Sequence, residues 1–164
     1  MRILKITPIL FCWFALASCS SAPDFGLPSV ELFDNESENM TMTLEVDANL
    51  NPDNEGRPSP LVFRVYQMTS DAQFRSLDFN TLYEQKSSVL GADLRKMDET
   101  ILLPGASISY NLKVFKDTQF IGILAAYQNE TGSKPKLVFP YDGDEADDLC
   151  IKVGSLKLDV VNDC

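Results

Sequence analysis

Residues 40–48, MTMTLEVDA, place an apolar side chain at every second position and a polar side chain between each pair. Neighbouring side chains of an extended strand point to opposite faces of a sheet. The spacing therefore predicts a β-strand with one buried face and one solvated face. The apolar set is Met40, Met42, Leu44, Val46 and Ala48.

Six further strand signals follow, joined by turns rich in Gly, Pro, Asn and Asp. Residues 97–103 end at a Pro-Gly pair and residues 108–114 alternate again, so these two strands are expected to form an antiparallel hairpin. The apolar run at residues 120–127 favours a central strand covered on both faces, although periodicity alone also allows a buried helix. Seven short strands predict an all-β protein, a β-sandwich. The other signals are residues 61–66, 136–139 and 156–160.

The segment between the second and third of these strands lacks alternation. Phe79, Leu82 and Tyr83 are spaced so that they share one face of a helix. Asp78 is suited to cap the start of that helix and Gly91 to end it. The sequence therefore predicts a small helical insertion packed against the sandwich.

The N-terminus has the features of an export signal. Arg2 and Lys5 precede a short apolar run at residues 9–17, which is too short to span a bilayer. Cys19 follows Leu-Ala-Ser, an arrangement that resembles the lipobox of bacterial lipoproteins, whose Cys is lipidated before cleavage. Ser20 occupies the position where Asp would favour retention in the inner membrane.

These features divide the chain into three parts. We expect residues 1–18 to be a signal peptide that is removed, leaving Cys19 to carry the lipid on the periplasmic face of the outer membrane. Residues 19–39 are rich in Ser, Pro, Asn and Glu and are expected to form a flexible tether. Residues 40–164 then form the sandwich domain.

Charge and composition exclude several classes of function. The full chain carries a net charge of −10 and contains no His. An acidic chain is poorly suited to nucleic acid, whose binding depends on Lys and Arg. Without His, the Ser-His-Asp and Cys-His arrangements and histidine zinc sites are impossible, so no enzyme and no cofactor are expected.

Two cysteines remain after the signal and lipid positions are set aside. Cys150 and Cys164 form an even pair in an oxidising compartment, so a disulfide between them is expected. The bond would close a ring of about 15 residues, worth roughly 3 kcal/mol in the chain-entropy estimate. It would also hold the C-terminal residues, which otherwise fray.

Two acidic segments partly match the pattern of a calcium-binding loop. Residues 142–148 begin with the Asp spacing of an EF-hand loop but have Asp147 where Gly is required. Residues 51–56 match the first six positions but lack the final Glu, because Val62 stands there. Solvated loops are therefore expected at both places, and no metal site.

Residues 49–60 form an unusually long connection between two consecutive strands. Three prolines stiffen it, and a stiff exposed loop binds a partner at lower entropic cost. From its sequence alone, the loop is as consistent with a spacer as with a partner-binding loop.

At this loop the chain resembles the type VI secretion outer-membrane lipoprotein family, TssJ (SciN). Residues 49–67 read NLNPDNEGRPSPLVFRVYQ, and the likeness extends in order and spacing over roughly residues 44–160. Further matching pieces are Phe74, Asp78-Phe79, Leu82-Tyr83 and residues 90–94, 103–105 and 120–127.

The resemblance implies a transthyretin-like β-sandwich and a role in the trans-envelope core of the secretion machine. It implies binding to the periplasmic C-terminal domain of TssM and, through TssM, an indirect association with TssL. The loop residues implied in that contact are Asn49, Asn51, Asp53, Asn54, Glu55 and Arg57. The alternative from the residues alone is a periplasmic lipoprotein that binds a small ligand.

Overall fold

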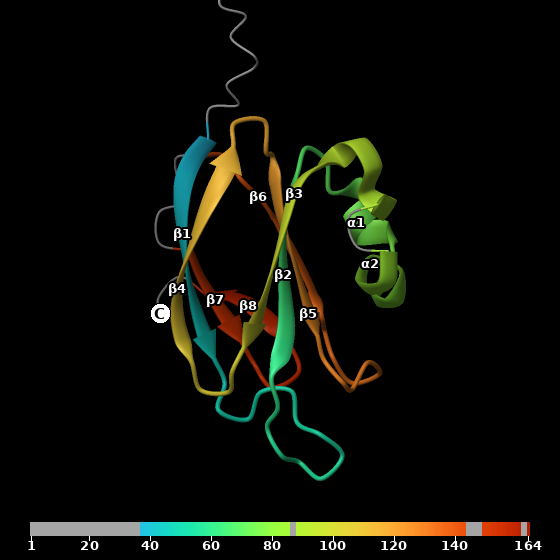
Figure 1. Cartoon of the computed structure of the whole chain (residues 1–164), viewed down its shortest axis with the longest axis vertical. Coiled ribbons are helices and arrows are strands. Elements are labelled where there is room, and N and C mark those ends of the chain that lie inside the picture. The colour runs from blue at the N-terminus through green and yellow to red at the C-terminus, as the bar shows by residue number, and fades with distance from the viewer. Residues whose placement is uncertain (1–36, 86–87, 144–148, 162–163) are drawn as a thin grey trace, which may run out of the picture. The chain divides into compact units, whose positions relative to one another are not determined.

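The computed structural model describes residues 37–85, 88–143, 149–161 and 164, in which two four-stranded sheets pack face to face (Figure 1). Sheet A has the order β4-β1-β7-β8, and its strands are β1 (Ser37–Val46), β4 (Ser107–Phe115), β7 (Leu149–Val153) and β8 (Leu158–Val161). Sheet B has the order β3-β2-β5-β6, and its strands are β2 (Leu61–Met68), β3 (Leu94–Leu102), β5 (Phe120–Ala126) and β6 (Lys136–Pro140). The predicted all-β sandwich is confirmed.

The main core lies between the two sheets. The even-numbered residues of β1 from Met40 to Val46 point inward, and Met42 and Leu44 are fully buried there. They meet Phe63 and Val65 from β2 and other buried side chains of sheet B. The alternation that predicted β1 is therefore the pattern of a strand with one face in this core.

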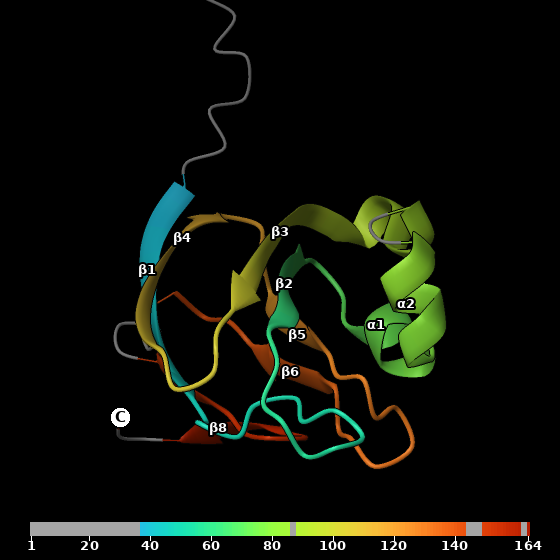
Figure 2. The ribbon, with the colours of Figure 1, turned by 60° about the horizontal axis from the view of Figure 1, so that its bottom comes forward.

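Sheet B has a second buried face. Tyr66, Met68 and Leu124 point away from the main core and pack with helical residues, including Phe74 and Leu82. Figure 2 shows the helices on this side of sheet B. β2 and β5 are covered on both faces, so nearly every residue of each strand is buried. The continuous apolar run that predicted β5 reflects this double cover.

The helical insertion between β2 and β3 is confirmed, but it is broken into short pieces. It consists of α1 (Ala72–Ser76), α2 (Phe79–Gln85) and the 3-10 segment η1 (Ser88–Asp93), in which Gly91 has a φ of 53°. Asp78 caps α2 as expected, since its carboxylate accepts a hydrogen bond from the main-chain N–H of Thr81 at 2.9 Å. Phe79 and Tyr83 stack with ring centroids 5.5 Å apart.

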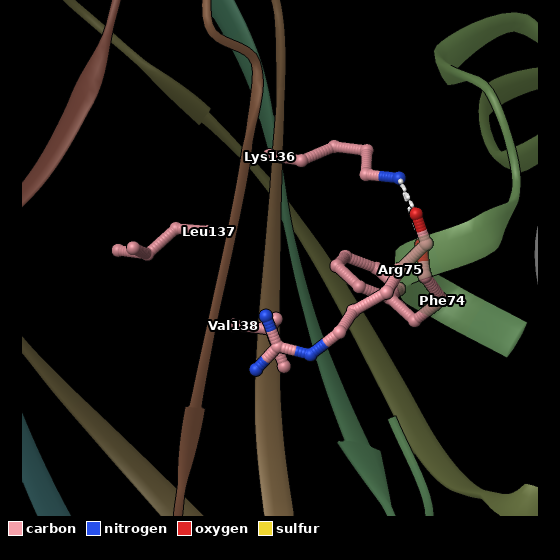
Figure 3. A pocket seen from close by; sticks show the side chains of 5 residues that line it. All are labelled: Phe74, Arg75, Lys136, Leu137 and Val138. Atoms are coloured by element: carbon pink, nitrogen blue, oxygen red, sulfur yellow. Dashed lines mark hydrogen bonds between the residues drawn. The ribbon is translucent and has the colours of Figure 1, made fainter. Parts of the chain in front are cut away.

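Two cations of sheet B hold this insertion in place. Arg64 is buried on β2, where its guanidinium donates to the carbonyl oxygen of Tyr83 at 2.8 Å, lies over the Tyr83 ring and pairs with Glu99 at 2.7 Å. Lys136 reaches from β6 to the end of α1, where its Nζ donates to the carbonyl of Phe74 at 2.8 Å (Figure 3). It also donates to the carbonyl of Leu77 at 2.5 Å. Each short helix thus has its carboxyl end satisfied by a positive side chain.

Gly122 allows the insertion to approach sheet B closely. A Cβ at this position would come within 2.8 Å of Met68 Cε and 3.0 Å of Phe74 Cζ. Since these approaches are closer than a Cβ normally makes, a side chain here would require Met68 and Phe74 to shift. Gly122 is therefore required by packing rather than by its backbone angles.

The predicted hairpin of residues 97–103 and 108–114 is wrong. β3 pairs with β2 in sheet B, whereas β4 pairs with β1 in sheet A, so the chain crosses between the sheets at Pro104-Gly105. The crossover is bonded to the end of β1, with Val46 N donating to Ala106 O at 2.9 Å and Gly105 N to Asp47 O at 3.1 Å. A tight Pro-Gly turn serves a hairpin or a crossover equally well, and the pattern does not distinguish them.

Sheet A also contains a strand that the pattern did not show. β7 lies beside β1 in parallel, with Leu44 opposite Ile151, and carries β8 on its other side. β1 is therefore hydrogen-bonded on both edges. Among the residues that the structure describes, no helix has the length and apolar character that a membrane crossing requires.

Candidate functional site

β1 and β2 are joined by residues 47–60, named here the β1–β2 loop, at one end of the sandwich (Figure 1). Leu50 is fully buried, and its carbonyl oxygen accepts a hydrogen bond from Ser59 N at 3.0 Å. Leu50 N in turn donates to Asp47 O at 3.1 Å. The two arms of the loop are thus bonded to each other and anchored in the core.

Asn51 fixes the base of the loop to two other segments. It is 2% exposed and has a φ of 46°, a conformation that Asn tolerates better than most residues. Its side chain donates to Pro60 O at 2.9 Å and accepts from Gln128 N at 2.8 Å. Its main-chain N–H donates to Ser155 O at 3.0 Å. Asn51 therefore holds the loop rather than offering its amide to a partner.

The tip of the loop is organised around Asp53. Its Oδ1 accepts hydrogen bonds from the main-chain N–H groups of Glu55 and Arg57, each at 2.9 Å, and its Oδ2 pairs with Arg57 Nε at 2.8 Å. Hydrogen bonds from the Arg57 backbone and guanidinium lower the pKa of the Asp53 carboxyl. Gly56, with a φ of 77°, supplies the left-handed residue that the turn requires.

The remaining predicted loop residues face solvent. Asn49, Asn54, Glu55 and Arg57 are exposed, and the side chains of Glu55 and Arg57 retain 71% and 69% of their accessible surface. A polar hollow of about 490 Å³ lies between the loop and the residues after β5, lined by Asn49, Pro52, Asp53, Asn54, Gly56, Gln128 and Asn129. The loop thus presents polar groups from a fixed backbone.

The sequence analysis did not predict that Gln128 helps to hold the β1–β2 loop. Its Nε2 donates to Ser59 Oγ at 2.6 Å, and its main chain bonds Asn51, so it ties the end of β5 to the loop. A polar residue directly after an apolar strand gives no signal of a contact so distant in sequence.

The structure describes only some of the other predicted sites. Cys150 and Cys164 form a disulfide with their Cα atoms 5.6 Å apart. Cys19 and the signal and tether residues up to 36 lie outside the described residues, as do residues 144–148 of the acidic segment. Within the described part of the chain, no three acidic or Cys side chains gather as metal ligands, and Asp53 is engaged by Arg57.

The structure thus describes a two-layer β-sandwich with a pre-ordered polar loop at one end. A family model described as "Type VI secretion lipoprotein, VasD, EvfM, TssJ, VC_A0113" matches residues 38–156. The chain therefore belongs to the TssJ family of type VI secretion lipoproteins. No curated protein sequence matches it at a significant level.

Solved structures agree with this family and fold. The chain is 28% identical to the type VI secretion lipoprotein TssJ1 of Pseudomonas aeruginosa, with a TM-score of 0.72, covering 77% of this chain and 96% of that one. It is 26% identical to Serratia marcescens Lip, described as a membrane-bound component of the type VI secretion system, with a TM-score of 0.70, 77% and 98% covered. A chain in a structure titled for the TssM C-terminal domain from EAEC shares the fold, at 19% identity, a TM-score of 0.65 and coverages of 77% and 98%.

Proposed function

We propose that this protein is a non-enzymatic, outer-membrane-anchored member of the type VI secretion membrane complex that binds the periplasmic domain of TssM. The β1–β2 loop is the proposed contact. TssL would then be reached only through TssM. This proposal rests on the family and on a fold shared with a chain in a structure titled for TssM.

The observation that carries the proposal is the internal order of the loop. Asp53 and Asn51 use their side chains within the protein, so the exposed groups are held in position before a partner arrives. A pre-ordered loop loses less conformational entropy on binding. The proposed contact residues are therefore the exposed Asn49, Asn54, Glu55 and Arg57, the last two of which also pair with each other through Arg57 Nη1 at 2.9 Å.

The sequence alternative, a small-ligand carrier, would need space between the sheets. That space holds the fully buried side chains of Met42, Leu44, Phe63, Ile121 and Ile151, among others. A packed interior of this kind supports an assembly role. We therefore propose no ligand, cofactor or catalytic residue.

The loop contact is tested with the triple variant Asn49→Ala, Asn54→Ala, Glu55→Ala. The variant removes exposed polar groups and leaves Asn51 and Asp53 in place, so we expect the loop to stay ordered. Binding to the purified TssM periplasmic domain, measured by titration calorimetry, should weaken by about tenfold or more, which corresponds to about 1.4 kcal/mol. A matched control is Thr41→Ala with Asn111→Ala, two exposed residues of sheet A that bond only each other's side chains.

A second variant separates loop order from direct contact. Asp53→Ala removes the acceptor of three hydrogen bonds and should both loosen the loop and weaken binding. If the triple variant binds TssM as tightly as the unchanged protein, the loop is not the contact. If the control pair weakens binding equally, the interface lies on sheet A instead.

The anchor is a separate part of the proposal. We propose that Cys19 carries the lipid, that residues 1–18 are removed and that the segment from residue 19 to the start of β1 at Ser37 forms a tether. Cys19→Ser should move the protein from the outer-membrane fraction to the soluble periplasmic fraction and stop secretion. Secretion that continues without the lipid would refute an essential anchoring role.

A further inference from the structure

β8 is the most weakly held strand of sheet A. It has four residues, lies at the edge of the sheet and is hydrogen-bonded only to β7. Leu158 is its one buried side chain in the main core, whereas Val160 is 42% exposed. A short edge strand with one buried apolar residue gains little from packing to offset the entropy of ordering its backbone.

The turn before β8 is fastened independently of the strand. Gly154 N donates to Lys157 O at 2.8 Å, and Lys134 N, from the segment before β6, donates to Leu156 O at 2.8 Å. The Tyr127 hydroxyl donates to Gly154 O at 3.1 Å. Any local release would therefore begin at Leu158 and not in the turn.

The disulfide joins the segment after β8 to the middle of the sheet. Cys150 lies on β7, on the face away from the main core and beside Thr43 of β1, yet it is only 2% exposed. Cys164 lies against it, with its Sγ 3.9 Å from the carbonyl oxygen of Thr43. The bond thus fastens the far end of β8 to β7 itself, at the position paired with Val161.

We propose that the Cys150–Cys164 disulfide is a redox-dependent lock on β8. When it forms, two thiols lose two electrons and two protons to a disulfide-bearing oxidant, which leaves as a dithiol. When a dithiol reductant reverses this exchange, β8 is released from Leu158 onward and the outer edge of β7 becomes free. β7 stays in place, because it is also paired with β1 and its Ile151 and Val153 are fully buried.

The lock is tested by hydrogen exchange on the full chain in detergent, with and without a dithiol reductant. Reduction should accelerate exchange of the β8 amides by about tenfold or more, while β1 and β5 change by less than about twofold. The double variant Cys150→Ser, Cys164→Ser should show the same pattern without reductant.

A matched variant distinguishes the covalent bond from packing. Oxidised Leu158→Ala loses the buried contact but keeps the disulfide, so its β8 should exchange more slowly than β8 of the reduced unchanged protein. Two results would overturn the lock: β8 exchange that does not respond to reduction, and acceleration of every strand together, which would make the bond a general stabiliser of the domain.

Discussion

The two sheets have four strands each, but they differ in how many faces they bury. Sheet B has the main core on one face and the helical insertion on the other, whereas the outer face of sheet A carries Thr41, Thr43, Ser109 and Asn111. The strands record this difference, since β1 and β4 alternate in sequence, while β2 and β5 are almost continuously buried and β5 is continuously apolar. Strand pattern therefore reports the number of covered faces.

Covering both faces of sheet B removes water from its buried polar groups, which costs free energy. The solvated outer face of sheet A avoids this cost. Polar groups that are buried beneath the insertion lose hydrogen bonds to water, and leaving them without partners in the protein costs free energy. Arg64 and Lys136 meet this requirement by bonding carbonyls at the ends of the short helices. The helical insertion and the positive side chains beneath it are thus one structural unit.

Phe74→Ala should have the largest effect among the variants that compare the covered face of sheet B with the outer face of sheet A. Phe74 is fully buried, 5.3 Å from the Tyr66 ring between centroids, so its truncation should lower the free energy of unfolding by about 3–5 kcal/mol, measured by urea denaturation. Thr41→Ala on the outer face of sheet A should change it by less than about 0.5 kcal/mol. A loss under about 1 kcal/mol for Phe74→Ala would mean that the insertion contributes little to the fold.

Gly122→Val should have the next largest effect. The added atoms would collide with Met68 and Phe74, so we expect a loss of about 1–3 kcal/mol in the same measurement. The matched change on the open face is Ser109→Val, which meets solvent and should be neutral within about 0.5 kcal/mol. Equal effects at the two positions would contradict the difference between the sheets.

Lys136→Met tests the hydrogen bonds that Lys136 donates to the end of α1. The variant keeps most of the apolar stem but leaves the carbonyls of Phe74 and Leu77 without their donor, at a cost of about 1–3 kcal/mol. Lys152→Met, on the exposed face of β7, should be nearly neutral in thermal unfolding. If both lysines behave alike, the bonds to α1 are not needed to hold the helix.

The smallest expected effect is the loss of the Asp78 cap of α2 at acidic pH. Hydrogen bonds from the main chain and hydroxyl of Thr81 lower the pKa of Asp78, so its folded pKa lies below the unfolded value near 3.9. The cap is therefore fully present above that unfolded value and is lost as pH falls through the folded pKa. The Thr81 amide should report this loss in an NMR pH titration, and Asp78→Ala should abolish the response.

The sequence predicted what local pattern controls and missed what depends on distant pairing. Alternation located β1 and β4, and the i, i+3, i+4 spacing of Phe79, Leu82 and Tyr83 located α2. The turn at Pro104-Gly105 was misassigned because its partner is the end of β1, which no local signal encodes. β7 was missed because it is short and follows an acidic segment.

The loop shows the same limit in the candidate site. Its length and its prolines marked residues 49–60 as unusual, and the family resemblance supplied a role. Which side chains turn inward depended on Gln128 and Ser155, far along the chain, so the inward position of Asn51 could not be read from the loop alone.

One consequence follows from the double pairing of β1. The chain enters this strand at Ser37 and leaves it at Val46, directly before the β1–β2 loop (Figure 1). Tension between the proposed anchor at Cys19 and a partner bound at the loop would therefore run along the axis of β1. Extracting β1 would require its hydrogen-bond ladders with β4 and β7 to shear at the same time. Ladders sheared lengthwise resist force better than ladders opened one bond at a time, so β1 is suited to act as the tensile member of the domain.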